Sequence, residues 1–393
     1  DTQNVTDMFG MFSDCSSLTS LDLSSFSILN NPLITNMFYN TGSNSQNKPI
    51  NIYVTPNTKS YIEWIDSDEK DDNNSNIDNN NATLVVIDED ESLEYALLPT
   101  GPEFNTIVDE YISKTSGITK IKFIAKSNIK SSNQLTHNIY LIQNGETLEI
   151  HTAADQFVAN NDCSLMFTGY KYEDNTLYIG DCDSFSNIES IDFGDNFNTH
   201  NVTDMSDMFS GCSALTSLDV TKFNTENVTS MFSMFSGCSA LASLDVRNFD
   251  TKNVWTMYCM FELCRSLTSL DVTNFNTKKV SNMTRLFGGC SGLTSLDVAN
   301  FNTENVTGMS GMFENCINLT SLDITNFNTE NVTNMTGMFN GCKGLVSLDL
   351  SNFNTRKVTG MSSMFSGCSN LTSLDLSNFD TQNVTYMGSM FSG

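Results

Sequence analysis

Apolar residues in the second half of the chain recur at a constant interval of 26 residues, without insertion or deletion. Valines and cysteines mark the interval: Val202, Val228, Val254, Val280, Val306, Val332, Val358 and Val384, and Cys212, Cys238, Cys264, Cys290, Cys316, Cys342 and Cys368. The spacing stays fixed only if every unit passes the chain to the next at the same place. The pattern therefore predicts a stack of like units, which is a solenoid.

Each unit divides into two segments with different apolar periods. The first segment has an apolar stripe about 120° wide at helical spacing, which predicts a short amphipathic helix. In one unit the residues of this stripe are Val202, Met205, Met208, Phe209 and Cys212. The second segment changes to period two, with Leu218 and Val220 inward and Asp219 outward, which predicts a strand. Strands pack about 4.8 Å apart and helices about 10 Å apart, so we expect the stack to curve, with the strands on the concave side.

The motifs of the unit resemble two known repeats. The core L-x-x-L-D-V/L-x-x-F resembles the leucine-rich repeat. The fuller pattern NF-N-T-x-N-V-T-x-M-x-x-MF-x-x-C-x-x-L-x-S-L-D is similar to the BspA-like repeat of bacterial and protist surface proteins, over residues 1–40 and about 187–393. The resemblance implies an α/β, leucine-rich-repeat-like solenoid with parallel strands on one face and short helices on the other. It also implies an extracellular or cell-surface location.

One position departs from the ordinary leucine-rich repeat, which has asparagine where this chain has Phe223 and its copies. We expect these rings to form a spine in place of the usual asparagine ladder. The backbone groups at that turn would then be satisfied by Asn224, Asp250, Asn276 and their equivalents.

The rest of the chain is organised differently. Residues 1–66 have the features of the C-terminal end and cap of a repeat array, and residues 67–82 are an acidic, asparagine-rich linker. Residues 83–160 predict a small α+β capping unit, and residues 161–393 predict an opening cap followed by the repeats. Both ends of the chain lie within a repeat and share the sequence D-T-Q-N-V-T, so we interpret the chain as an excerpt of a longer polypeptide.

The small unit has clear local signals. Apolar patterns predict strands over 83–87, 118–124 and 138–142, and Pro102 opens a helix that is predicted to run to Ile112. Asn144-Gly145 lies between two apolar runs, which predicts a tight hairpin. In the preceding segment, Tyr61–Trp64 predicts an aromatic helix that covers the end of the first array.

Composition and charge narrow the partners. The net charge of −27 argues against nucleic acid and anionic membranes, because both would repel the chain. No run of 18 apolar residues occurs, so no membrane span is predicted. Of the eleven cysteines, eight share one repeat position. Side chains of such a ladder point the same way, so we expect buried free thiols rather than disulfides.

One candidate binding site is a stripe of carboxylates on the predicted concave face. Its residues are Asp219, Asp245, Asp271, Asp297, Asp323, Asp349 and Asp375. The stripe has two interpretations: solvated structural aspartates, or a surface that attracts a basic partner or Ca²⁺. Ca²⁺ takes about 6–8 oxygen ligands, and two carboxylates per gap supply too few. We therefore expect no bound metal or cofactor, with Ca²⁺ as the one candidate.

A second candidate lies where one unit breaks the pattern on its outer face. Trp255, Tyr258, Cys259 and Leu263 replace small polar residues there. An exposed aromatic cluster with an extra thiol favours lateral contact with another chain. The alternative interpretation is tolerated drift, or cover by the small unit.

Catalysis has little support in the sequence. The histidines His137, His151 and His200 are scattered, and no nucleophile elbow, phosphate loop or metal-ligand spacing accompanies them. N-x-S/T sequences such as the one at Asn227 are glycan acceptors or helix caps. We expect a non-enzymatic adhesin that binds protein or glycan at the cell surface. The alternative is a self-associating structural subunit of an extracellular filament or surface coat built from tandem copies.

Overall fold

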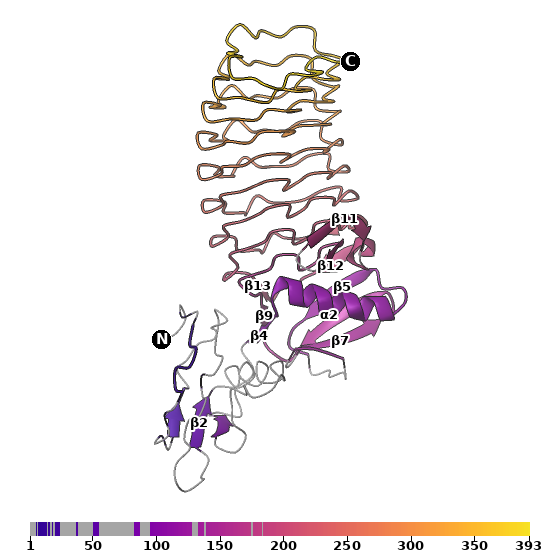
Figure 1. The fold of residues 1–393 in the computed structure, drawn as a ribbon. Coiled ribbons are helices and arrows are strands. Elements are labelled where there is room, and N and C mark those ends of the chain that lie inside the picture. The colour runs from indigo at the N-terminus through magenta and orange to yellow at the C-terminus, as the bar shows by residue number, and fades with distance from the viewer. Residues whose placement is uncertain are drawn as a thin grey trace.

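The computed structural model describes residues 95–127, 133–136, 139–173, 176–182 and 184–393 and, nearer the N-terminus, residues 5, 7–13, 15, 18, 20–23, 37, 50–54 and 82–86. It is mixed α/β, with parallel sheets and few helices. Within the described ranges the helices are α2 (Gly101–Lys114) and the short 3-10 helix η1 (Ser184–Asn187). Figure 1 shows stacked coils above the part that holds α2. We call residues 199–393 the column and each of its 26-residue units a coil. The predicted segment Tyr61–Trp64 and the linker up to residue 81 lie outside the described residues.

One six-stranded sheet joins the small unit to the column. Its order is β14-β12-β5-β8-β7-β6, with β14 at Ser217–Leu218, β12 at Ser190–Asp192, β5 at Lys120–Ile124, β8 at Thr147–Thr152, β7 at Ile139–Asn144 and β6 at Gln134–Thr136. Strands β14, β12, β5 and β8 are parallel, whereas β7 and β6 are antiparallel to their neighbours. Because β12 and β14 carry the S-L/I motif of the repeats, the column continues the sheet of the preceding unit.

Three smaller sheets complete the described strands. Parallel strands β13 (Phe197–Asn198), β9 (Gln156–Val158) and β4 (Tyr95–Leu97) form one sheet, and β1 (Ser20–Asp22), β2 (Ile50–Val54) and β3 (Ala82–Val86) form another. Strands β10 (Tyr170–Glu173) and β11 (Thr176–Cys182) form an antiparallel pair. The strand predicted over 83–87 is β3, and it pairs with β2.

The local predictions in the small unit are confirmed. Helix α2 begins with a capping box between Thr100 and Glu103, has Pro102 in its first turn, and buries Phe104 and Val108. Strands β7 and β8 form the predicted hairpin, but Asn144 pairs with Thr147, so the two turn residues are Gly145 and Glu146, one position later than predicted. Gly145 has φ +59°, and a two-residue hairpin turn favours glycine where its first residue needs a positive φ.

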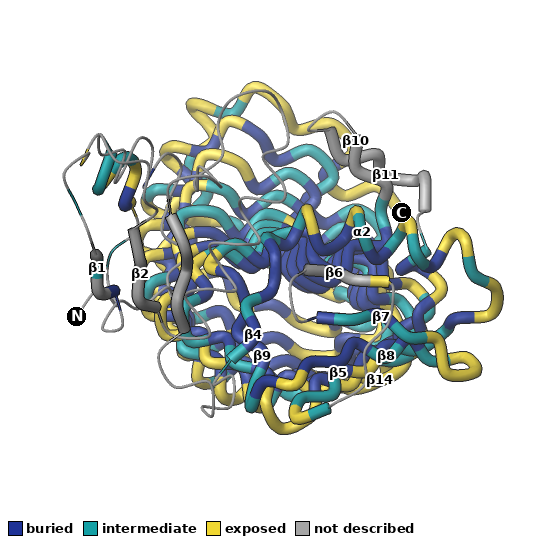
Figure 2. Tube along the Cα trace, turned by 90° about the horizontal axis from the view of Figure 1, so that it is seen from below, coloured by how far each residue is buried: buried dark blue, intermediate teal, exposed yellow. Residues whose placement is uncertain are grey.

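Helix α2 lies across the end of the column's core. Phe104 of α2 makes an edge-to-face contact with Phe167, with ring centroids 5.2 Å apart, and Phe167 stacks on Phe209 of the first coil at 5.5 Å. Figure 2, viewed along the column, shows α2 in front of the buried interior. The helix therefore supplies the apolar cover that the first coil needs.

The first segment of each coil is not the predicted helix. Its backbone bonds to the next coil instead: the amide of Met205 donates to Ser230 O at 3.1 Å, and that of Phe209 donates to Met234 O at 2.9 Å. Parallel bridges repeat this link from Asp162 through Asp204, Ser230, Thr256, Asn282, Gly308, Asn334 and Gly360 to Tyr386. The helix fails because Asp207 and Gly211 have φ +54° and +76°, and their equivalents in the following coils share this conformation. An α-helix needs φ near about −60° at every residue.

The predicted strand of each coil is also largely absent. It forms only at β14, and the equivalent segments of later coils have no assigned strand within residues 219–393. The predicted curvature depended on helices that keep one side about 10 Å apart. Those helices are missing, and Figure 1 shows the coils stacked without a marked bend. Asn227, predicted as a glycan acceptor or a helix cap, donates Nδ2 to His200 O of the preceding coil at 2.8 Å.

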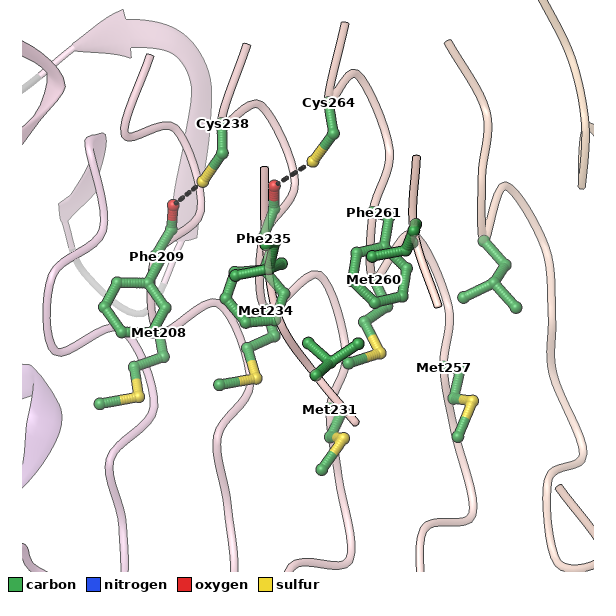
Figure 3. Packing of buried hydrophobic residues seen from close by; sticks show 14 of the residues in the cluster. Met208, Phe209, Met231, Met234, Phe235, Cys238, Met257, Met260, Phe261 and Cys264 are labelled. Atoms are coloured by element: carbon green, nitrogen blue, oxygen red, sulfur yellow. Dashed lines mark hydrogen bonds between the residues drawn. The ribbon is translucent and has the colours of Figure 1, made fainter. Parts of the chain in front are cut away.

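The core of the column is a stack of phenylalanine rings from the M-F motif (Figure 3). Successive centroids are 5.5–5.9 Å apart along Phe167, Phe209, Phe235, Phe261, Phe287, Phe313, Phe339, Phe365 and Phe391. Beside the stack, Cys238 Sγ donates to Phe209 O at 3.2 Å, and later coils repeat this bond. The described repeat cysteines form no disulfide, and those from Cys212 to Cys342 are buried, as predicted. Burial was also expected for Cys15 and Cys368, but Cys15 is exposed and Cys368 is only partly buried.

A spine of rings was expected at Phe223 and its copies, but the continuous stack is formed by the phenylalanines of the M-F motif. The Phe223-type rings pack beside the stack, as Phe249 does 6.4 Å from Phe235. The turn backbone is satisfied both by the expected Asn and Asp side chains and by buried threonines. Oδ1 of Asn224, Asp250 and Asn276 each accepts the backbone N–H two residues ahead, at 2.9–3.2 Å. Thr225 Oγ1 donates to Asp250 O at 3.2 Å and accepts from Asp250 N–H at 2.7 Å. The same pair of bonds recurs at Thr199, Thr251, Thr277, Thr329 and Thr355.

Candidate functional site

The seven aspartates of the predicted stripe occupy equivalent positions on one face of the column, which we call the aspartate face. Each Oδ1 accepts a hydrogen bond from the backbone N–H two residues ahead, at 2.9–3.1 Å. At Asp219, Oδ1 also accepts from the Thr221 hydroxyl at 2.6 Å. The aspartates therefore hold a turn in each coil while their carboxylates remain at the surface.

At six of these aspartates the hydrogen bonds favour the ionised carboxylate. Hydrogen bonds from Thr221 lower the pKa of Asp219, and those from Arg247 lower the pKa of Asp245 to about 2. Similar bonds lower the pKa of Asp271, Asp323, Asp349 and Asp375. A donor that bonds to the charged form of a carboxylate favours that form, so the face stays negative well below neutral pH.

This row of charged side chains extends from the column across the six-stranded sheet of the small unit. Pairing places Glu149 of β8 opposite Lys122 of β5, and Lys122 opposite Asp192 of β12. The next register position, one step beyond the β12–β14 pair Ile191–Leu218, belongs to Asp219. Lys122 Nζ lies 3.4 Å from Asp192 Oδ2. One line of charged side chains thus runs from the small unit onto the coils. The charges alternate in sign from Glu149 to Asp192 and are negative from Asp192 onward.

A cavity of about 370 Å³ opens in this row where the sheet meets the first coils. Its apolar lining includes Phe193, Phe197 and Phe223, and its polar lining includes Asp192, Asp219 and Lys222. The three rings form one cluster, with Phe193 4.6 Å from Phe197 and 5.0 Å from Phe223. An apolar wall with a few charged groups at its rim is the usual composition of a small binding pocket.

Charged groups around the cavity are partly paired. Lys222 Nζ bonds to Asp195, and Asp192 Oδ1 accepts from Gly194 N–H at 2.9 Å. Asp219 Oδ1 holds the Thr221 turn, and Asp219 Oδ2 has no hydrogen-bond partner among the described residues. Asp192, Asp195 and Asp219 outnumber Lys122 and Lys222, so the rim has a surplus of negative charge.

The predicted lateral cluster is only partly at the surface. Trp255 is 55% exposed, whereas Cys259 is buried and Leu263 is half-buried. Tyr258 stacks on Phe232 of the preceding coil, with ring centroids 4.9 Å apart. The extra thiol is therefore not part of an exposed patch, and burial raises the pKa of Cys259 well above its usual value. Trp255 alone projects into solvent.

Chemical reactivity has little structural support in the cysteines. Burial raises the pKa of Cys264 to about 12, and the other interior repeat cysteines shift in the same direction. The thiolate is the nucleophile of cysteine, so these side chains are inert packing groups. Within the described residues, no group of three His, Cys, Asp or Glu side chains is arranged to hold a metal ion.

His151 lies in a buried hydrogen-bond network. Its ring is buried, Nδ1 lies 2.8 Å from Ser127 Oγ, and Nε2 lies 2.9 Å from Glu149 Oε2. Glu149 also accepts from Asn144 Nδ2, which is the main cause of its lowered pKa. The network gives each ring nitrogen a partner, as a buried imidazole requires. His137 lies outside the described residues.

Sequence reasoning missed the cavity at the start of the stripe. Its residues come from β12 and the turn after it, where Ser190-Ile191-Asp192-Phe193 is a divergent copy of the S-L-D-V motif. That copy was assigned only to a cap. The signal that could have found the site is the pair Lys122 and Asp192, since both lie on the outward face of neighbouring predicted strands.

The comparisons with known proteins give a family but no described relative. No curated protein and no solved structure matches the chain. In the described part of the chain, no helix combines the length and the apolar character that crossing a bilayer requires. The family described as "Mycoplasma protein of unknown function, DUF285" matches residues 1–79, 179–296 and 282–393, which is more than half of the chain. The chain belongs to this DUF285 family of repeat proteins.

Proposed function

We propose that the chain is a non-enzymatic surface protein, a leucine-rich-repeat-like solenoid of the BspA-like kind, that binds another macromolecule through its aspartate face. The observation that carries the proposal is the continuous row of ionised side chains from Glu149 across the sheet to Asp375. The acidic part of this row, from Asp192 to Asp375, raises the local concentration of a basic partner and orients it along the column.

Binding also fits the way the column is stabilised. Its interior is held by the phenylalanine stack and the buried threonines, none of which needs the aspartate carboxylates. The side chains of the aspartate face can therefore change without loss of the stack. A rigid scaffold whose charged face is separate from its core is suited to recognition at a cell surface.

The first experiment measures retention of the purified chain on intact cells and on extracted surface proteins and glycans. A variant with Asp271→Asn, Asp297→Asn and Asp323→Asn removes three charges from the face while Asn keeps an oxygen for each turn. The control, Glu226→Gln, Glu304→Gln and Glu330→Gln, removes three exposed charges from another turn. We expect about tenfold weaker retention for the first variant only, since each exposed charge pair contributes about 0.2–1 kcal/mol. Equal retention of both variants would refute the proposal.

The second candidate function is a structural subunit of a filament or coat, and the exposed Trp255 favours it. A tryptophan that is 55% exposed on an otherwise polar wall is the type of side chain that anchors protein contacts. Sedimentation velocity over a concentration series tests it. Trp255→Ser should remove concentration-dependent association, whereas Val346→Ser, which removes another exposed apolar side chain, should not. Association that survives Trp255→Ser excludes this contact.

A further inference from the structure

We propose that the cavity at the junction of sheet and column is a pocket for one basic side chain, arginine or lysine, of a partner polypeptide. The inference rests on the proposed function, because it names the chemistry that the aspartate face recognises at one point. It is carried by the shape, the wall and the charge of the cavity lined by Asp192, Phe193, Phe223 and Asp219.

The wall suits the stem and the face of a basic side chain. Phe193, Phe197 and Phe223 are held nearly buried, so they form a preformed apolar surface rather than a flexible one. Long basic side chains lay their methylene groups along such surfaces and keep the charged head in water. A guanidinium or ammonium close to a ring face gains a further cation–π attraction.

The rim suits a positive head group. Asp192 and Asp219 both line the cavity and both accept a backbone N–H through Oδ1, which fixes the direction of each carboxylate. Asp219 Oδ2 has no hydrogen-bond partner among the described residues, and Asp192 Oδ2 lies 3.4 Å from the exposed ammonium of Lys122. An anionic ligand would meet these carboxylates and be repelled.

Lys222 provides an internal competitor for the same charges. Its ammonium bonds to Asp195, and this bond is the main cause of the raised pKa of Lys222. The charge of Asp219 raises that pKa further. Removing this lysine should leave the rim more negative and therefore improve the binding of a cation. A residue with only a structural role in the turn would produce no such gain.

The volume of the cavity limits the ligand to a small group. About 370 Å³ lies at the low end of the range for small-molecule pockets, roughly 300–1,000 Å³. The cavity can therefore take the end of one side chain, while the backbone that carries it lies along the row of aspartates. Along that row, Asp245 is already paired with Arg247 of its own coil. That intramolecular pair shows the type of contact that we propose at the cavity.

The test uses the full chain and the peptide acetyl-Gly-Ser-Arg-Ser-Gly-amide, with a lysine peptide and a citrulline peptide as probes. Citrulline has nearly the shape of arginine without its charge. We expect the arginine and lysine peptides to bind at least about fivefold more tightly than the citrulline peptide in NMR titrations. Asp192→Asn and Asp219→Asn should each weaken binding of the arginine peptide about threefold to fivefold, and Lys222→Met should strengthen it about twofold.

The matched control is Asp349→Asn, which removes a carboxylate with the same turn bond from the same row, five coils from Asp219. It should leave the affinity for the arginine peptide unchanged. Equal losses from Asp349→Asn and Asp219→Asn would overturn the pocket and leave a general electrostatic face, as in the proposed function. Equal affinity for the arginine and citrulline peptides, or binding of a neutral oligosaccharide in place of both, would also overturn it.

Discussion

The two walls of each coil satisfy their backbone in different ways. On the wall that contains the M-F motif, amides bond directly to carbonyls of the next coil, as Met257 N–H does to Asn282 O at 3.2 Å. On the aspartate face, side chains do this work: Asp271 accepts from Thr273 N–H, and Asn274 Nδ2 donates to Arg247 O of the preceding coil. The first wall, which we call the bonded wall, fixes the stacking of the coils. The second is a row of turns whose outward side chains are available for contact.

The largest expected effect comes from breaking the stack behind the bonded wall. Phe287 is fully buried between Phe261 and Phe313, at 5.8 and 5.9 Å. Phe287→Ala should lower the free energy of unfolding by about 3–5 kcal/mol, because it removes a ring and leaves a cavity. Urea unfolding followed by circular dichroism measures this. The control Val346→Ala, on the exposed surface, should change stability by less than about 0.5 kcal/mol.

The next effect concerns a buried carboxyl on the bonded wall. Asp207 is 8% exposed and its Oδ1 has no hydrogen-bond partner, so burial raises the pKa of Asp207 to about 7. The folded state therefore binds the proton more tightly than the unfolded state. Asp207 stabilises the fold fully below about pH 4, and this contribution is lost as the pH rises through about 7.

Asp207→Ser should remove this pH dependence, since serine occupies the equivalent positions Ser233 and Ser363 with φ +49° and +55°. The variant should gain stability over the natural chain between pH 4 and pH 8, by roughly 2–4 kcal/mol at the upper end. Unfolding midpoints measured across that range test the prediction. A difference between the two proteins that does not change with pH would contradict it.

A smaller effect is expected from the buried threonines between the two walls. Thr277 Oγ1 donates to Asn302 O and accepts from Asn302 N–H, at 2.9 and 2.8 Å. Thr277→Val has the same shape but leaves both backbone groups unpaired, so it should cost about 2 kcal/mol. Thr307→Val is the matched control, because the Thr307 hydroxyl is exposed and its loss can be compensated by water. Similar losses in the two variants would disprove a special role for the buried ladder.

The smallest effect on stability is expected at one residue of the bonded wall with a strained backbone. Leu263 has φ +59° where most coils have glycine, a conformation that costs a side chain about 1–2 kcal/mol. Leu263→Gly should raise stability by up to about 1 kcal/mol, because the relief exceeds the loss of a half-buried side chain. Leu263→Ala keeps the strain and loses the contact, so it should lower stability. Thermal unfolding of the two variants should therefore show shifts of opposite sign in the unfolding temperature.

The sequence predicted the stacking but assigned the two segments of the coil incorrectly. Val202, Met205, Met208 and Phe209 are all buried, as a helical stripe would require. However, the observed coil gives the same spacing of buried residues without a helix. Its turns alternate inward and outward side chains and include residues with positive φ. Gly311 and Gly337, at the position of Asp207, were a signal against a helix, since glycine is unfavourable inside one. The hairpin at Asn144-Gly145 and the helix at Pro102 were predictable because each depends on a few adjacent residues.

The candidate site was predictable only where it repeats. The spacing of Asp219 and its copies placed them on one face, but nothing in that spacing indicated that each carboxylate accepts a turn amide. The cavity depends on Asp192, Phe193 and Lys222, which come from different units and meet only because β12 pairs with β14. Such contacts between distant segments follow from the three-dimensional register and not from any local pattern.

The constant offset of the bonds between coils has a consequence for how such proteins change in length. Every second amide from Met205 to Gly211 finds its carbonyl 25 residues ahead, and the buried threonine Thr277 finds its partner at the same offset. Duplication or loss of one whole coil leaves every donor with an equivalent acceptor, whereas a shorter insertion would misplace the partners of the coil that carries it. Evolution can therefore lengthen or shorten the column in whole steps and keep both faces in alignment.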